Sequence, residues 1–172
     1  MQLLGLENDA PRLISTAGRW TSLRADEDGH GLTPDGRSVV VTEASAAGDG
    51  DIALLALDGT EDRTIVSAPT NDTDPAVSPD GLSVVFLRTT TGDVFIRHGD
   101  VDLVVVGIDG TGERTIARSA CGCAAVWAPD GSRVATWTND LQQLRVDGEG
   151  APVHVPTPGN VGAMSWQTST AQ

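Results

Sequence analysis

Four short acidic segments are the first place in this chain to look for chemistry. They are ADEDGH (residues 25–30), GDGD (48–51), NDTD (71–74) and HGDVD (98–102). Clustered carboxylates could ligate Ca²⁺, which prefers oxygen ligands, and Asp72 and Asp74 are the candidate pair. None of the segments matches the twelve-residue loop of an EF-hand, and Asp is common in turns. The sequence therefore predicts no metal site, and Asp72 and Asp74 are the residues on which this prediction can be tested.

The residues of a nucleophilic site are present but scattered. His30, His98 and His154 fall at unrelated positions, and no G-x-S-x-G segment occurs. An α/β-hydrolase nucleophile needs that segment, and a triad needs its base beside the nucleophile. No glycine-rich stretch lies between a strand and a helix, as a nucleotide loop requires. We predict no catalytic residues and no cofactor.

Cys121 and Cys123 are separated by a single residue. A disulfide across so short a span is geometrically awkward, and one Cys-x-Cys pair supplies half of a typical four-ligand zinc site. We interpret them as two small buried residues that enter a strand.

Composition excludes several partners. The 172 residues suit one domain, and the net charge is −13, with 24 acidic residues against 11 basic ones, all of them arginine. Such a chain repels phosphate backbones and anionic headgroups, so we expect no nucleic acid partner. No run approaches the roughly 20 apolar residues of a membrane span, and the start of the chain lacks the features of a signal peptide. We therefore expect no direct membrane insertion.

The chain contains a repeat that organises these residues. TPDGRSVVV (33–41), SPDGLSVVF (78–86) and APDGSRVAT (128–136) are three copies of one phrase. Each P-D-G predicts a type I turn in which proline presets φ and glycine accepts a positive φ. The predicted turn residues are Pro34, Asp35, Gly36, Pro79, Asp80, Gly81, Pro129, Asp130 and Gly131.

A second phrase follows each copy. It reads DIALLALDGTEDRTIV from Asp51, DLVVVGIDGTGERTIA from Asp102 and LQQLRVDGEGAPVHV from Leu141. Apolar runs such as Val84–Leu87 predict strands buried on both faces, and each D-G predicts a tight hairpin to an outer strand. The fold class is therefore all-β, with units of four antiparallel strands that are typical of propeller blades. A sandwich is the alternative, although its strands would more often alternate apolar and polar residues.

These phrases resemble the WD40-like (PD40) repeats of TolB-type β-propellers. The resemblance implies about three blades plus half-blades at both ends, an incomplete propeller in a single domain. The units are 30–67, 74–118 and 122–156, with the end of a preceding blade at 1–17 and the start of the next at 160–172, where Trp166 matches Trp127. A closed ring needs at least about four blades, so we expect a segment of a larger protein, with self-association through open blade edges as an alternative.

Segments that the copies do not share are the predicted places for function. The second copy carries an insertion at 92–102, where Val94, Phe95, Ile96 and Arg97 are the candidate partner-binding residues. The loop at 19–31 is a second such segment. In the third copy, Gln143 and Arg145 replace apolar residues, which indicates that one face of that strand meets water.

The predicted function is a non-catalytic scaffold that binds a protein or peptide. By resemblance to the TolB family, an extracytoplasmic location in the periplasm or cell envelope is favoured. The alternative is the propeller portion of a larger peptidase or lyase, which would gate access of substrate to a site outside this chain.

Overall fold

A computed structural model describes residues 2–7, 10–15, 20–22, 31–45, 49–60, 62–89, 101–120, 125–137, 140–157 and 165–166. These residues form fourteen β-strands, and no helix occurs among them. In this part of the chain, accordingly, there is no helix that could cross a membrane.

The strands form four antiparallel sheets in which neighbours along the chain are neighbours in the sheet. A two-stranded sheet pairs β1 (Gln2–Glu7) with β2 (Ala10–Ser15). The first four-stranded sheet contains β3 (Trp20–Ser22), β4 (Ser38–Ala44), β5 (Gly50–Ala56) and β6 (Asp62–Val66). The second contains β7 (Asn71–Val77), β8 (Ser83–Thr89), β9 (Val101–Gly107) and β10 (Arg114–Ala120). The third contains β11 (Val126–Trp127), β12 (Arg133–Trp137), β13 (Leu141–Arg145) and β14 (Val153–Val155).

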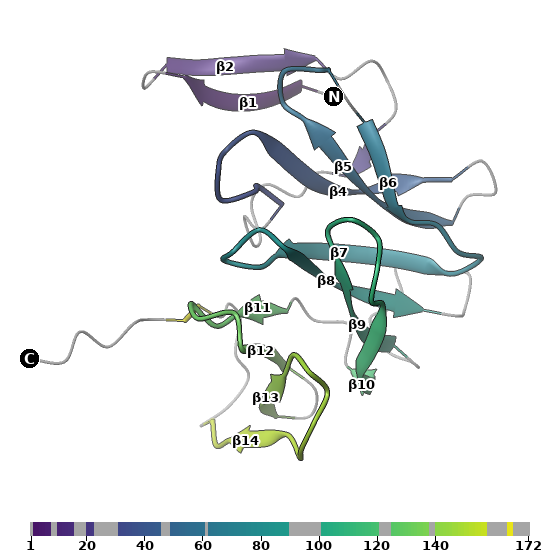
Figure 1. Ribbon diagram of the computed structural model, residues 1–172, viewed down its shortest axis with the longest axis vertical. Coiled ribbons are helices and arrows are strands. Elements are labelled where there is room, and N and C mark those ends of the chain that lie inside the picture. The colour runs from purple at the N-terminus through teal and green to yellow at the C-terminus, as the bar shows by residue number, and fades with distance from the viewer. Residues whose placement is uncertain are drawn as a thin grey trace, which may run out of the picture.

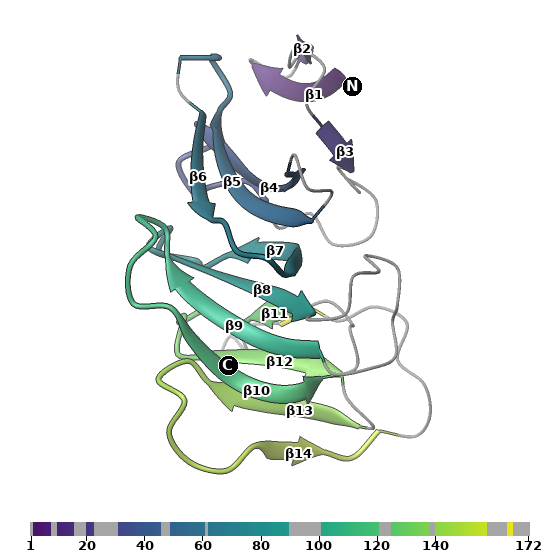
Figure 2. The same ribbon diagram turned by 90° about the vertical axis from the view of Figure 1, so that its right-hand side faces the viewer.

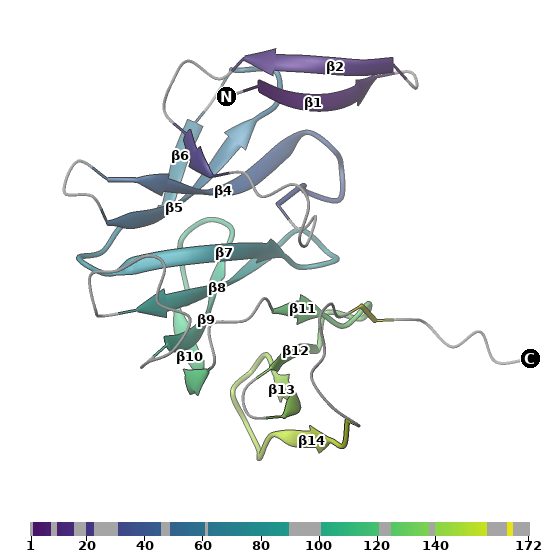
Figure 3. The same ribbon diagram turned by 180° about the vertical axis from the view of Figure 1, so that it is seen from behind.

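The sheets are stacked face to face in chain order, as Figure 1 shows from purple to yellow and Figure 3 shows from behind. Two apolar cores hold the stack together. One joins Val40 and Ile52 of the first sheet to Phe86 of the second. The other joins Leu103 of the second sheet to Trp127 of the third.

The central strands of the second sheet are covered on both faces. Every side chain from Val84 to Leu87 is at most 2% exposed, and Leu103 to Val106 are fully buried. Because successive side chains of a strand point to opposite faces, each residue of such a run contacts one of the two neighbouring sheets. The prediction of doubly buried strands is confirmed.

Two arginines join neighbouring sheets at the outer strands. Arg63 of β6 donates from Nη2 to the carbonyl oxygen of Ile108 in the second sheet, at 2.8 Å. Arg114 of β10 donates from Nε to the carbonyl oxygen of Val146 in the third, at 2.7 Å. Both arginines begin an R-T-I phrase, and both acceptors precede a D-G turn. At the corresponding place the third sheet has Pro152, which cannot make this bond.

Two tryptophans make a matching bond near the inner strands. Trp127 Nε1 donates to the carbonyl oxygen of Ala76 in the second sheet, at 2.9 Å, and this bond is buried. Trp166 Nε1 donates to the carbonyl oxygen of Val126 in the third sheet, at 3.0 Å. Ala76 and Val126 both lie three residues before the proline of a P-D-G turn. Trp166 therefore repeats the contact of Trp127, which agrees with their matching places in the sequence.

Replacing Trp127 with phenylalanine is expected to lower the free energy of unfolding by about 1 kcal/mol, because the ring is kept and the buried hydrogen bond is lost. Trp166→Phe removes the same bond at a partly buried site and should cost less. Urea denaturation followed by circular dichroism measures both. A Trp127→Phe protein as stable as the wild type would contradict the contribution of this bond.

One detail of the sheets differs from the sequence-based expectation, and another agrees with it. The predicted loop at 19–31 contains β3, which pairs with β4, so the first sheet begins before the predicted start of its unit at residue 30. In β13, only Leu144 is buried, whereas Gln143 is partly exposed and Arg145 is exposed. This strand meets water more than its counterpart β9, as predicted.

Candidate functional site

The three P-D-G segments are type I turns, as predicted. In each, the glycine N–H donates to the carbonyl oxygen three residues earlier, from Gly36 to Thr33, from Gly81 to Ser78 and from Gly131 to Ala128, at 2.8–2.9 Å. The glycines have φ values of 68°, 74° and 69°. Each turn joins the inner strand of its sheet to the next strand, or in the first sheet Leu32 to β4.

The aspartate of each turn is locked by the turn itself. Asp80 Oδ1 accepts hydrogen bonds from the Ser78 hydroxyl at 2.5 Å and from Leu82 N at 3.0 Å. The Ser78 bond and then the Leu82 bond lower the pKa of Asp80. The Thr33 hydroxyl lowers the pKa of Asp35 in the same way, and the Ser132 N–H lowers that of Asp130. These exposed carboxylates therefore stay ionised at mildly acidic pH.

The D-G hairpins lie at the same end of the sheets as the P-D-G turns. In each sheet the residue before the D-G aspartate donates its N–H to a carbonyl oxygen in the inner turn, at 2.8–3.1 Å. The three bonds run from Leu57 to Arg37, from Ile108 to Leu82 and from Val146 to Ser132. Figure 2 shows this arrangement, with β8 beginning and β9 ending on the same side. We call this side the turn end.

A hollow of about 310 Å³ opens between the inner strands at the turn end. Its lining comes from all three sheets: Leu32, Pro34, Val77, Ser78, Pro79, Val126 and Trp127. Leu32 is 52% exposed, although most large apolar side chains of the described residues are buried. Two inner turns contribute Pro34, Ser78 and Pro79 to the hollow, and the third blade contributes Val126 and Trp127 of β11.

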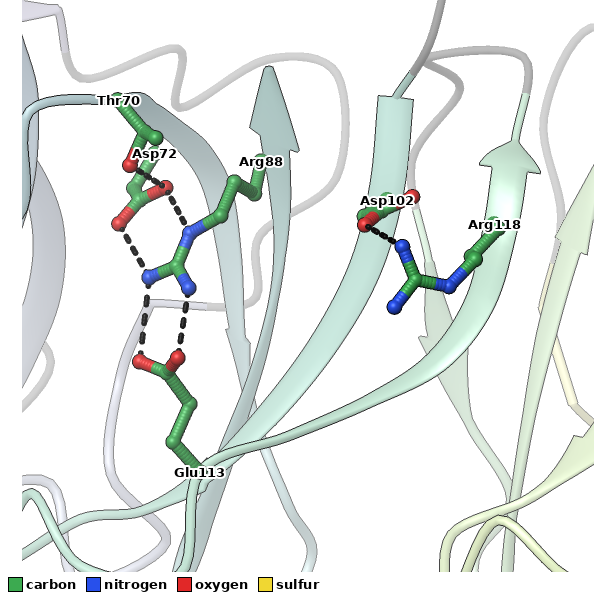
Figure 4. Close-up of polar contacts among 6 residues, drawn as sticks. All are labelled: Thr70, Asp72, Arg88, Asp102, Glu113 and Arg118. Carbon is green, nitrogen blue, oxygen red and sulfur yellow. Dashed lines mark hydrogen bonds and ion pairs between the residues drawn. The ribbon is translucent and has the colours of Figure 1, made fainter. Parts of the chain in front are cut away.

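The second sheet also carries a charge network around one buried carboxylate (Figure 4). Asp72 is fully buried, and its two oxygens accept hydrogen bonds from Nε and Nη2 of Arg88 at 2.8 and 2.9 Å. The guanidinium lies over the ring of Phe86 and also binds Glu113, at 2.6 and 3.1 Å. Burial raises the pKa of Asp72, and the hydrogen bonds from Arg88 oppose that effect.

In the structure, the carboxylates of the candidate metal pair, Asp72 and Asp74, interact with other protein side chains. The Asp72 carboxylate is occupied by Arg88 and by the Thr70 hydroxyl, which donates at 3.2 Å. Asp74 is exposed, has a positive φ of 51° at a bulge in β7 and accepts a hydrogen bond from Thr73. Among the described residues, no three metal-ligating side chains form a cluster.

Most of the other predicted site residues fall in segments that the structure does not describe. Val94, Phe95, Ile96 and Arg97 lie outside the described residues, as do Cys121, Cys123, His30 and His98. His154 lies within them, and its Nδ1 contacts Asp140 Oδ2 at 2.7 Å on the surface of the third sheet. In the described ranges no hydroxyl group bonds this histidine, so it forms no triad there.

Several solved structures resemble this arrangement of sheets. No protein-family model matches the sequence, and no curated protein matches it significantly. Among solved structures, TolB from Acinetobacter baumannii matches with a TM-score of 0.64 at 14% identity, over 86% of this chain and 35% of that one. A TolB-type protein from Agrobacterium tumefaciens matches with a TM-score of 0.54 at 24% identity, over 72% of this chain and 44% of that one. A nidogen/laminin complex matches with a TM-score of 0.60 at 15% identity, over 88% of this chain and 54% of that one.

The chain has a partial TolB-like β-propeller fold. Its four-stranded sheets are the blades of that propeller, and the predicted fold class is confirmed. The chain spans less than half the length of either TolB protein that it matches. Structures named as an oligogalacturonate lyase and a puromycin-hydrolyzing peptidase also match, so the fold serves binding proteins and enzymes alike.

Proposed function

We propose that this chain is a non-catalytic part of a propeller scaffold that binds an extended segment of a protein or peptide in the hollow at the turn end. The meeting of apolar side chains from three blades at one hollow, with Leu32 exposed, carries this proposal. Leu32, Val77 and Trp127 come from three blades, so one ligand side chain would contact all of them. Apolar walls with a few polar groups are typical of ligand sites.

The size of the hollow favours part of a chain over a whole cofactor. Its volume of about 310 Å³ lies at the lower end of ligand pockets, which range from about 300 to 1,000 Å³. One large apolar side chain fits such a space. The nidogen/laminin complex, which has a similar fold, supports the use of propeller surfaces for protein binding. The likeness to TolB favours a location in the cell envelope.

An enzymatic role is the second candidate, because a lyase and a peptidase share the fold. In that case the chain would gate the access of substrate to a site elsewhere. Neither likeness outweighs the likeness to TolB. The single histidine of the described residues, His154, is exposed beside Asp140, which supports a non-catalytic role.

A random peptide library displayed on phage provides the test. Peptides selected on the wild-type protein should bind about tenfold more weakly to Leu32→Ser, because the ligand loses an apolar contact. Leu82→Ser is the matched control, since Leu82 is 66% exposed at the same end but does not line the hollow. Calorimetric titration with the synthetic peptides gives the affinities.

Two results would count against the proposal. One is a library that yields no binder, or binders that respond equally to both leucine substitutions. The other is cleavage of the bound peptides, observed by mass spectrometry and retained after purification, which would make the chain an enzyme.

A further inference from the structure

Strand β7 is the inner edge of the second blade, beside the hollow. The sheet has the order β10-β9-β8-β7, so among the described residues no strand pairs with the other edge of β7. Ser78 donates its N–H to the carbonyl oxygen of Ser83, and the Ser78 N–H therefore points toward β8. Successive residues of a strand direct their N–H and C=O groups to opposite edges. Those of Val77, which lies across from Val84 in the same ladder, therefore point to the open edge.

Leu32 of the first blade has the same orientation. It lies in an isolated antiparallel bridge with β4. The hydrogen bonds of this bridge are made by the neighbours of Leu32: Thr33 N–H donates to the carbonyl oxygen of Ser38, and Val40 N–H donates to that of Gly31. The N–H and C=O groups of Leu32 therefore also point away from the sheet. The repeat thus turns main-chain groups toward the hollow in two neighbouring blades.

Val77 presents the better fixed of these main-chain pairs. It belongs to a regular strand of seven residues, and it is partly exposed. Leu32 lies outside the strands of its sheet. Main-chain groups that the fold already holds in place lose little entropy when a ligand binds them.

Prolines isolate the main-chain pair of Val77. Residues two places apart on a strand face the same edge, and for Val77 these are Pro75 and Pro79, neither of which has an N–H. The ladder with β8 is also irregular at a bulge between Thr73 and Ala76. From residue 75 to residue 79 the open edge therefore offers a complete N–H and C=O pair at Val77 only. Such an edge resists pairing with a long strand, but it can bind one residue of a ligand.

The side chain of Val77 sets the direction in which a bound residue would point. Residues that lie across from each other in an antiparallel pair project their side chains to the same face. Val77 packs against the core that joins the first and second blades, and it lines the hollow. The side chain of a ligand residue across from Val77 therefore points toward the first blade, where Leu32 is exposed.

We propose that one residue of an extended segment binds across from Val77. Its N–H donates to the carbonyl oxygen of Val77, its carbonyl oxygen accepts from the Val77 N–H, and its apolar side chain enters the hollow beside Leu32. This inference rests on the proposed function and adds the means by which the partner is recognised. When a segment joins an open edge, main-chain bonds give affinity and a pocket selects the side chain. The partner is therefore an unfolded segment and not the face of a helix, whose main-chain groups are already paired.

Ester substitutions in the ligand test the main-chain bonds. In the tightest peptide from the phage library, each amide link is replaced in turn by an ester, which removes one N–H and keeps every side chain. One ester is expected to bind the wild-type protein about five- to tenfold more weakly than the parent peptide, because one hydrogen bond is lost. The affected residue should be the one whose replacement with alanine weakens binding most. Calorimetric titration gives the affinities.

A substitution in the protein tests the second bond. Val77→Pro removes the N–H, and proline is tolerated on an edge where the N–H points away from the ladder. It should weaken the parent peptide about fivefold more than Val77→Ala, which trims the side chain but keeps the N–H. Circular dichroism checks that both variants fold. The ester series uses the wild-type protein, so it tests the inference even if Val77→Pro does not fold.

The outcomes distinguish the inference from the proposed function. If peptides bind in a manner that depends on Leu32 but all esters bind within about twofold of the parent, the main-chain bonds are wrong and the binding site stands. If esters at several alternate positions all weaken binding, a longer strand has joined the edge, and the single pair at Val77 is wrong. If the library yields no binder, the proposed function fails and the inference fails with it.

Discussion

A Gly81→Val protein is expected to lose about 3 kcal/mol or more of its free energy of unfolding. Gly81 has a φ of 74°, and a β-branched residue in this region is strained by about 1–3 kcal/mol. In addition, a Cβ at this position would lie 3.2 Å from Cδ of Pro34 in the preceding blade. Because a proline ring cannot rotate away, this contact should add about 1–3 kcal/mol. Urea denaturation followed by circular dichroism measures the loss.

Gly36→Val is the matched control for the contact. Gly36 occupies the same place in the first turn with a φ of 68°, and nothing lies within 4 Å of its added Cβ. It should therefore show the backbone strain alone. Equal losses at the two positions would show that the contact between Pro34 and Gly81 adds nothing, and no loss at either would contradict the turn assignment.

An Arg88→Met protein is expected to lose about 3–5 kcal/mol of its free energy of unfolding, because the substitution leaves Asp72 charged and buried without its partner. The methionine keeps most of the apolar contact with Phe86, so the loss reports mainly on charge. Arg118→Met is the matched control, since Arg118 is 79% exposed and its 3.5 Å contact with Asp102 should contribute less than about 1 kcal/mol (Figure 4).

The loss in Arg88→Met should depend on pH. Without Arg88, the burial that raises the pKa of Asp72 is opposed only by the smaller effect of the Thr70 hydrogen bond, so the folded variant binds a proton more readily than its unfolded chain. Stability then rises as pH falls through the raised folded pKa, and the difference from the wild type narrows under acidic conditions. Denaturation at neutral and acidic pH measures this. A difference that stays constant with pH, and no recovery in the double variant Asp72→Asn/Arg88→Met, would contradict the assignment.

The repeat made the turns and the central strands predictable. Proline and glycine at fixed places determine the P-D-G turns through their own φ preferences, and the runs at Val84 and Leu103 carry enough apolar residues to indicate burial on both faces. Strand β3 was not predicted, because Trp20–Ser22 carries neither phrase and is a strand only by pairing with β4.

The hollow could have been found by one further comparison of the copies. The residue two places before each proline is apolar in all three: Leu32, Val77 and Trp127. The role of Asp72 could not be predicted, because its pairing with Arg88 depends on the register between β7 and β8, which the local sequence does not reveal.

The predicted partner site at Val94–Arg97 stays a prediction, separate from the hollow. These residues lie outside the described part of the chain.

The bonds between the second and third blades also bear on the shape of any ring built from such units. Trp127 ties the blades together near the inner strands, and Arg114 ties them near the outer strands. Two attachments at different radii fix the angle between neighbouring wedges, whereas one alone would leave a hinge. The angle per wedge determines how many wedges complete a circle, so two hydrogen bonds to backbone carbonyls help to set the symmetry of the propeller.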